Sequence, residues 1–429
     1  KMFKILFFLF VSVFLVDAKH EEFIGHSLYE VKVHNLEQVD DLNAIVESLN
    51  LDIWSYAVPG SNGLILVSKD LKETFENKLR SIGVDYKIDT ANIKEKLDLE
   101  DQLFAEAYKT ANVSELGRSS SRLSMNVIHR YAVVDQYLTD IARRYPNVAR
   151  VVSAGRSREG RDIKYLRISS DNFQNARKPV VFMQSLLHAR EWITLPITLY
   201  AIQKLVVDVS EQDLVRDVNW IILPIANPDG YEFSHTRTRM WRKNRANPNA
   251  LCPGVDLNRN YDVNWGTASS NSACSETFHG ARAFSEPETQ ITRNIINNFR
   301  SRLSLFLDMH SFGSMILYAY GNRTLPSNAL TLNMIGVQMA QRINAVKWPN
   351  NPNYRVGNIV DVIRYFASGG ASDYAQIMIG QKFSFTYELP AHRNQNGLNG
   401  FLVDPAFIPQ AAFETWEGVK VAARYVARN

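Results

Sequence analysis

The segment HAREW, residues 188–192, places a histidine and a glutamate three residues apart, directly after the apolar run PVVFMQSLL. At a junction between a strand and a helix, the side chains of His188 and Glu191 can face one point in space. One imidazole nitrogen and one carboxylate are two of the three protein ligands of a catalytic zinc site of the His2Glu type. A pair at this spacing also arises by chance or as a surface ion pair, so a third ligand is needed.

His310 is the candidate for the third ligand. It closes the apolar run LSLFLDMH, residues 303–310, which has the composition of a buried strand. Open α/β sheets gather their ligands at the carboxyl ends of strands, so His310 can join the pair from a neighbouring strand. A lone histidine at a strand end is usually structural, but position and type together predict that His188, Glu191 and His310 bind one metal ion.

The elements around these residues predict an α/β domain. From about residue 125, apolar strands alternate with helical segments, and long apolar strands of this kind are typical of a parallel sheet covered on both faces. Helices are expected at 191–209 and near 410–427. We therefore predict a mixed, largely parallel central sheet covered by helices. Its strands are expected at 148–155, 162–169, 179–187, 218–227, 303–310 and 382–389.

The preceding hundred residues predict a second, smaller domain. They read as strand, helix, strand, strand, helix, strand, which is the order of a small α+β, ferredoxin-like fold. A charged helical stretch, 91–110, then leads to the polar segment GRSSSR, which contains Arg118 and Arg122. Exposed polar segments are preferred sites of proteolysis. The strands are expected at 27–33, 51–57, 63–68 and 84–88, and the helices at 36–49 and 70–82.

The amino terminus has the pattern of a secretory signal peptide. Lys1 and Lys4 flank an apolar run that ends in VDA and is too short to cross a bilayer comfortably. We therefore expect 1–18 to be removed and a soluble protein to be secreted; a buried core helix is the alternative. An oxidising compartment permits a disulfide, and the two cysteines of the chain allow one, Cys252–Cys274.

Composition and charge exclude several classes. With 45% hydrophobic and 21% charged residues, the 429-residue chain is not disordered, and two cysteines exclude a disulfide scaffold, a multi-cysteine zinc finger and an Fe–S protein. Residues 19–118 carry 11 basic and 19 acidic side chains, whereas 119–429 carry 35 and 24. These opposite net charges favour docking of the front segment onto the body, or an anionic ligand. Neither a basic run nor aromatic–basic interleaving indicates nucleic acid.

The sequence resembles the zinc metallocarboxypeptidases of the carboxypeptidase A/B type, on the A-like side, in zymogen form. Beside HAREW, five stretches match the family in order: RMWRKNR at 239–245, GVDLNRN at 254–260, HS at 310–311, YFASGGASDY at 365–374 and FTYEL at 385–389. The region 19–110 resembles the family's prosegment. The resemblance implies a carboxypeptidase fold in which 19–118 form an activation prosegment and 119–429 the catalytic domain.

The resemblance implies a role for each matching residue. The three metal ligands would bind one Zn²⁺ per chain and leave its fourth position to water. Glu388 would be the general base, and Arg242 would polarise the scissile carbonyl and stabilise the oxyanion. Asp256 is a candidate acceptor for a zinc-bound histidine, with turn capping as the alternative. The residues implied in binding the terminal carboxylate or an adjacent subsite are Arg190, Asn258, Arg259 and Tyr365.

The pocket for the C-terminal side chain of the substrate is expected to be neutral. The family places an aspartate just before the Asp of its GGxxD motif when it takes Lys or Arg ends, and an aliphatic residue when it takes apolar ends; Ser372 stands there in this chain. A buried, unpaired Lys or Arg tail would cost several kcal/mol. Phe312 replaces a frequent tyrosine, which removes a hydroxyl contact but keeps an apolar wall. The other expected lining residues are Leu317, Gly321, Val360, Ala367 and Thr386.

The expected function is that of a secreted zymogen whose mature form removes aliphatic and aromatic C-terminal residues. A trypsin-like protease would activate it by cutting after Arg118 or Arg122. We expect a monomer in the digestive lumen, with peptide and protein C-termini as substrates, proteinaceous carboxypeptidase inhibitors as further partners, and neither membrane nor nucleic acid. Two alternatives remain: a basic-residue enzyme, which Ser372 disfavours, and an inactive binding protein, which the intact ligands and base disfavour.

Overall fold

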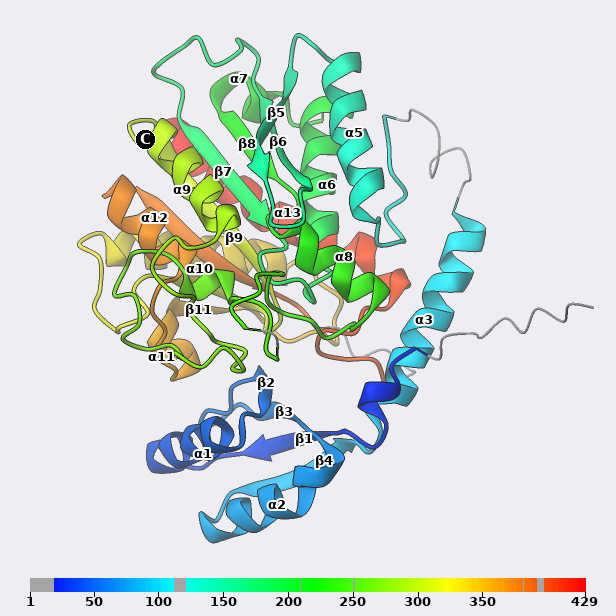
Figure 1. The fold of residues 1–429 in the computed structure, drawn as a ribbon. Helices are drawn as coiled ribbons and strands as arrows, with labels where there is room; N and C mark the ends of the chain where they lie inside the picture. The colour runs from blue at the N-terminus through cyan, green and yellow to red at the C-terminus, as the bar shows by residue number, and fades with distance from the viewer. Residues whose placement is uncertain (1–18, 112–120, 209, 250, 381, 392–396) are drawn as a thin grey trace, which may run out of the picture.

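The computed structural model describes residues 19–111, 121–208, 210–249, 251–380, 382–391 and 397–429. The expected signal peptide, 1–18, and the expected cleavage residue Arg118 lie outside these ranges. Figure 1 shows a small front domain beside a larger body, with one long helix that runs from the front domain along the side of the body.

The front domain is a four-stranded antiparallel sheet in the order β2-β3-β1-β4, with both of its helices on one face. Tyr29 and Ile65 pack against the two helices, whereas Leu28, Trp54 and Leu66 point the other way, toward the body. The predicted ferredoxin-like order is therefore confirmed, and the sheet is apolar on both faces. The elements are β1 (Ser27–Lys32), α1 (Leu36–Leu49), β2 (Asp52–Ser55), β3 (Gly63–Val67), α2 (Lys72–Ser81) and β4 (Asp85–Thr90).

Helix α3 (Ile93–Thr110) connects the front domain to the body. Ile93 and Leu97 are fully buried beside Leu398 and Phe401 of the body. Farther along, the ring of Phe104 contacts Trp192 edge-on at 6.1 Å between centroids. The helix is amphipathic, and its apolar side faces the body along most of its length.

The body is built on an eight-stranded sheet in the order β11-β10-β12-β9-β7-β8-β6-β5. Its central pairs, β12–β9, β9–β7 and β7–β8, are parallel, and antiparallel pairs flank them. The predicted mixed, largely parallel sheet is confirmed. The strands are β5 (Ala149–Arg156), β6 (Asp162–Ile168), β7 (Val180–Ser185), β8 (Asn219–Leu223), β9 (Leu303–Ser311), β10 (Met315–Tyr318), β11 (Arg355–Asn358) and β12 (Phe383–Leu389).

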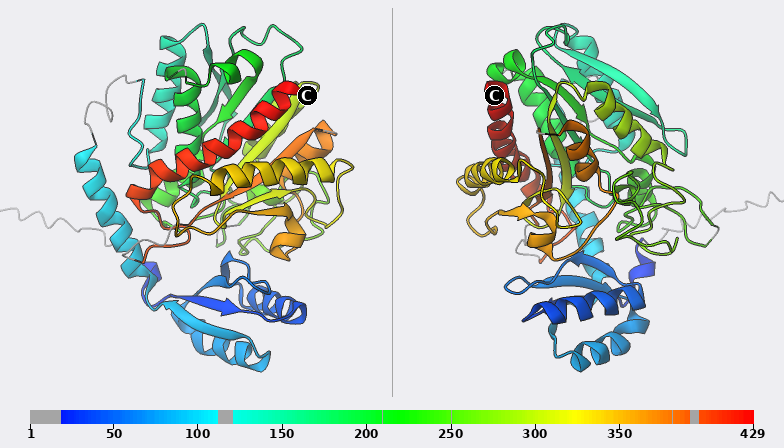
Figure 2. Two further views of the ribbon diagram at one scale, coloured as in Figure 1. Left: turned by 180° about the vertical axis from the view of Figure 1, so that it is seen from behind. Right: turned by 90° about the vertical axis from the view of Figure 1, so that its left-hand side faces the viewer.

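Helices cover both faces of this sheet, as Figure 2 shows from two further sides. Along β7, Val181 and Met183 join the core under one set of helices, whereas Val180 and Phe182 join the core under the other, as the two-residue period of a strand requires. One face carries α5 (Tyr131–Arg144), α6 (Thr194–Ile202), α10 (Ala329–Asn344) and α13 (Ile408–Arg428), and the other carries α9 (Pro287–Phe299) and α12 (Ala371–Ile379).

Three short helices, α7 (Gln212–Asp217), α8 (Pro228–Thr236) and α11 (Ile359–Ile363), lie between these elements. The predicted disulfide Cys252–Cys274 is present and ties together the loop that follows α8. In the described parts of the chain, we find no helix with the length and hydropathy needed to span a bilayer.

Candidate metal centre and substrate cleft

Three strand ends meet at one edge of the large sheet. β7, β9 and β12 are adjacent and parallel, so their carboxyl ends lie side by side. His188 lies three residues beyond the end of β7, and His310 is the second-last residue of β9. Glu388 is the register partner of His310 on β12. The chain thus brings the predicted ligands and the predicted base together from segments far apart in sequence.

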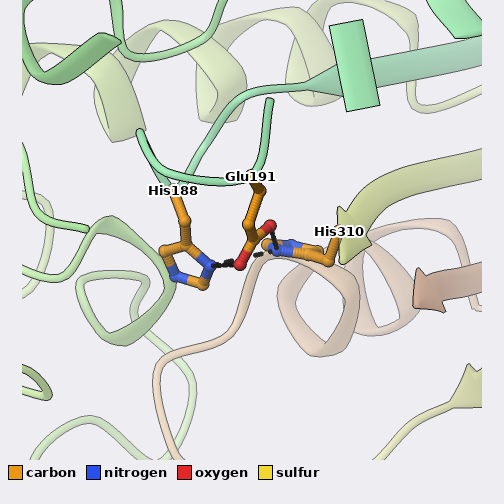
Figure 3. Close-up of side chains that lie close together, drawn as sticks. All are labelled: His188, Glu191 and His310. Carbon is orange, nitrogen blue, oxygen red and sulfur yellow. Dashed lines mark hydrogen bonds and ion pairs between the residues drawn. The ribbon is translucent and has the colours of Figure 1, made fainter. Parts of the chain in front are cut away.

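His188, Glu191 and His310 converge on one point (Figure 3). Nδ1 of His188 lies 2.8 Å from one carboxylate oxygen of Glu191, and Nδ1 of His310 lies 3.0 Å from the other. The two Nδ1 atoms are 3.2 Å apart. All three side chains are buried, so bulk water does not separate them.

This donor set fits zinc. Two imidazole nitrogens and one carboxylate, with their ligand atoms within 4.8 Å of one another, are the protein ligands of an open catalytic zinc site. Burial alone would raise the pKa of Glu191, but the facing His188 and His310 hold that pKa below its usual range. The carboxylate is therefore ionised, as a metal ligand must be.

Asp256 lies on the far side of His188. Its Oδ1 is 3.0 Å from Nε2 of that imidazole, and its Oδ2 accepts a hydrogen bond from Arg242 at 3.0 Å. Although burial opposes ionisation, Arg242 and His188 hold the pKa of Asp256 well below its usual range. Asp256 also accepts from the backbone N–H of Asn258. Both contacts weighed from the sequence, to a histidine and within a turn, are therefore made by this one carboxylate.

Glu388 faces the same cavity as the metal ligands. Desolvation raises its pKa to about 8; the neighbouring His310 opposes this shift, and Glu191 adds to it. Arg242 also lines the cavity, and its pKa is raised by Asp256 and Glu191 against the effect of burial. A carboxyl group with a raised pKa beside a permanent cation is an arrangement suited to proton transfer next to a developing oxyanion.

The predicted carboxylate-binding residues line the cavity beside the metal centre. Oδ1 of Asn258 accepts from the backbone N–H of Ala371 at 2.8 Å, and the guanidinium of Arg259 lies 6.0 Å from the ring of Tyr365. Gly369 makes this packing possible, since its φ is +70° and an added Cβ would lie 2.2 Å from the carbonyl oxygen of Arg259. The Tyr365 loop therefore packs directly on the backbone of Arg259.

The predicted side-chain pocket is partly assembled. Ala367 and Thr386 line the cavity, and the hydroxyl of Thr386 hydrogen-bonds that of Ser372. Gly321 donates its N–H to Asp373 at 2.7 Å, and burial raises the pKa of Asp373 to about 6. The predicted lining residues that do not reach the surface of this cavity are Leu317, Gly321, Val360 and Ser372.

The front domain covers the cavity, which has a volume of about 1140 Å³ and is lined by both parts of the molecule. Asp52 accepts two hydrogen bonds from Arg190, at 2.6 and 2.9 Å. Tyr56 stacks on Tyr365 with ring centroids 4.5 Å apart. Two of the side chains expected to bind substrate, those of Arg190 and Tyr365, are thus occupied by the front domain.

A second contact fastens α3 to the body. Glu100, which is 1% exposed, accepts hydrogen bonds from Nε and Nη2 of Arg239 at 2.7 and 3.1 Å. The same carboxylate accepts the backbone N–H of Val403 at 2.6 Å. The guanidinium of Arg239 lies 3.6 Å from the centre of the Trp192 ring. This buried ion pair joins residues 139 positions apart in the chain.

Sequence reasoning missed these covering contacts. The acidic balance of 19–118 predicts attraction to the body, but it does not single out Asp52 or Glu100 from the other acidic residues. Sequence reasoning also assigned no role to the buried carboxylates of Asp308 and Asp373. Asp308 does stand out in the sequence as a charged residue within the apolar run LSLFLDMH.

An α/β body that gathers two imidazoles and a carboxylate at its strand ends, under a cover formed by its own front domain, defines a metalloenzyme in zymogen form. The chain belongs to the zinc carboxypeptidase family: the family model described as zinc carboxypeptidase matches 134–418, and the model described as carboxypeptidase activation peptide matches 29–100. The protein is therefore a carboxypeptidase with an activation peptide, and its cofactor is zinc.

Relatives match along almost the whole chain. A carboxypeptidase B of Helicoverpa zea is 42% identical, and the match covers 96% of each chain. A carboxypeptidase A2 of Rattus norvegicus is 30% identical over 95% of each. The crystal structure of a carboxypeptidase A from Helicoverpa armigera is 57% identical, covers 95% of this chain and 99% of its own, and has a TM-score of 0.92. The relatives carry both A and B in their names.

Proposed function

We propose that this zymogen yields an exopeptidase that prefers aliphatic and aromatic C-terminal residues. The observation that carries the proposal is a neutral hydroxyl pair: Thr386 lines the cavity, and Ser372 hydrogen-bonds Thr386 from beneath the cavity surface. A Lys or Arg tail placed beside these hydroxyls would be desolvated without a carboxylate partner from either residue. Asp373 does not supply one, because it is turned to the backbone N–H of Gly321.

The roles proposed for the cleft residues follow from their positions. Bound zinc supplies a Lewis acid that activates water and polarises the scissile carbonyl. Glu388 accepts a proton from the attacking water and returns it to the leaving amine. Arg242, oriented by Asp256, holds the developing oxyanion. Asn258 and Arg259 bind the terminal carboxylate of the substrate, and Tyr365 closes over it.

Latency is proposed to arise by occupation of the cleft. Asp52 neutralises Arg190 and Tyr56 covers Tyr365, while the metal ligands beneath remain assembled. In this proposal 1–18 are a signal peptide, 19–118 the activation prosegment and 119–429 the catalytic domain of a secreted, monomeric digestive enzyme. A trypsin-like protease would cut after Arg118 or Arg122 and leave 307–311 residues. Arg122 forms an ion pair with Asp208, which a cut after Arg122 would have to break.

The main alternative is a preference for basic C-terminal residues, because the Helicoverpa zea relative is named carboxypeptidase B. The two preferences are distinguished by comparing the rates at which the last residue is released from matched peptides that end in Leu, Phe, Lys or Arg. We expect Leu and Phe to be released far faster, and Ser372→Asp to shift the preference toward Lys and Arg. Ser384→Asp is unsuitable as a control because the Ser384 hydroxyl binds Ser372, so Ser301→Asp, at an exposed serine of the catalytic domain, serves instead. A wild-type preference for Arg would refute the proposed pocket.

A further inference from the structure

Asp308 is a buried carboxylate on the strand that carries the second histidine ligand. In β9 it lies two residues before His310, so both side chains project from the same face of the sheet. Asp308 is 0% exposed, and its neighbours along the strand are apolar. An ionised carboxylate in such surroundings is costly unless charged or hydrogen-bonding partners compensate it.

Each oxygen of Asp308 has a distinct environment. Oδ1 accepts a hydrogen bond from Nε2 of Gln184 at 2.8 Å, and the amide oxygen of Gln184 accepts from Thr292 at 3.0 Å. Oδ2 lies 2.9 Å from Nε2 of His310, at ion-pair distance, and has no hydrogen-bond partner among the described residues. One side of the carboxylate is therefore anchored to β7, and the other side faces the imidazole.

The imidazole of His310 is thus placed between two different partners. Its Nδ1 points to the metal centre, 3.0 Å from Glu191 and 3.2 Å from Nδ1 of His188. Its Nε2 lies 2.9 Å from Asp308 and, farther away at 3.5 Å, the side-chain amide nitrogen of Asn258. A metal ligand needs a free lone pair on the coordinating nitrogen, which requires the ring proton to be on the other nitrogen. A carboxylate at Nε2 favours that tautomer.

We propose that Asp308 is a positioning residue for the metal centre, and that it holds the Nε2–H tautomer of His310 so that Nδ1 is available to zinc. Gln184 and Thr292 fix the carboxylate in turn. The centre then has two supporting carboxylates, Asp256 for His188 and Asp308 for His310, and each ligand histidine is oriented from behind. Asp256 also binds Arg242, whereas Asp308 is held by Gln184.

The test measures zinc binding by the full chain rather than activity. Asp308→Asn keeps the shape but presents an amide N–H to Nε2, which favours the wrong tautomer; Asp308→Ser removes the carboxylate. We expect the zinc dissociation constant, measured by equilibrium dialysis against a graded chelator, to rise about 10- to 100-fold in both. The absorption spectrum of the Co²⁺-loaded protein should also shift, because the geometry of a ligand imidazole changes.

The matched control is Asp140→Asn, since Asp140 is 2% exposed and lies in α5, where it accepts from Gln136 and Arg143. This variant should leave the dissociation constant and the cobalt spectrum unchanged. If neither Asp308 variant folds, Gln184→Met, which frees only Oδ1, should still weaken zinc binding several-fold. A dissociation constant and a cobalt spectrum equal to those of the parent in the folded variants would overturn the proposal.

Discussion

The metal centre and the interface that covers it are built in opposite ways. The centre comes from the ends of β7, β9 and β12, whose order in the sheet fixes where His188, His310 and Glu388 meet. The cover depends on contacts between distant segments: apolar packing of the front domain and α3 on Leu398 and Phe401, and the ion pairs Asp52–Arg190 and Glu100–Arg239. In the proposed account, the metal centre at the strand ends is assembled before activation, and latency comes from contacts of the front domain that can be released.

Loss of a metal ligand should have the largest effect. His310→Ala removes one of three protein ligands, so we expect loss of bound zinc and of measurable hydrolysis after activation, while the prosegment still docks. Metal content by elemental analysis and a peptide-release assay check this. Retention of one zinc per chain in this variant would contradict the ligand set.

Glu388→Gln separates chemistry from assembly at the same strand ends. The variant keeps shape and hydrogen-bonding capacity but cannot accept a proton, so turnover should fall by at least about 10²-fold. Zinc content should stay at one per chain. A near-parental rate from the zinc-loaded variant would show that another group is the base.

Glu100→Gln is expected to weaken the docking of the prosegment on the body. Removal of one member of a buried ion pair leaves Arg239 uncompensated, which should weaken prosegment docking by about 3–5 kcal/mol. We expect partial activity in the uncut chain, which a peptide-release assay measures. We also expect faster loss of the prosegment after cutting, which gel filtration measures.

The control for this variant lies on the same helix. Glu106→Gln breaks an exposed pair with Lys109, whose side chains are 70% and 68% exposed, and exposed pairs contribute little. Equal effects of the two substitutions would mean that α3 is not fastened by the buried pair.

The pH dependence of the activated enzyme should show the smallest change. Glu388 must be ionised to accept a proton, so kcat/KM should fall as pH falls through its pKa. Burial raises that pKa to about 8 in the covered cleft, and both zinc and exposure to water after activation lower it. The acid limb should therefore lie below pH 8, and a rate that rises steadily toward low pH would exclude Glu388 as the base.

Much of this architecture is predictable from the sequence, because apolar periodicity specifies buried elements. The predicted helix 36–49 coincides with α1, the buried strands β7 and β12 lie within the predicted runs, and β9 extends one residue beyond the predicted run 303–310. β10 and β11, with four residues each, are too short to show a period, and the sequence analysis did not expect them.

The metal ligands and the general base could be predicted because they stand in the motifs HAREW, HS and FTYEL. Asp308 and Glu100 were missed for a physical reason: a carboxylate within a strand or a helix is defined by its partner across the fold. Glu100 contacts Arg239 only when α3 docks, and Asp308 is anchored by Gln184 only once β9 is paired with β7.

We propose that the front domain holds an assembled zinc centre inactive until the chain is cut. The direct measurement is zinc content and release of C-terminal Leu or Phe from the 19–429 protein, before and after limited trypsin treatment, with the new amino terminus sequenced. We expect one zinc per chain throughout, negligible release before the cut, and release after a cut at Arg118 or Arg122. Full activity in the uncut protein, or zinc bound only after the cut, would contradict the claim.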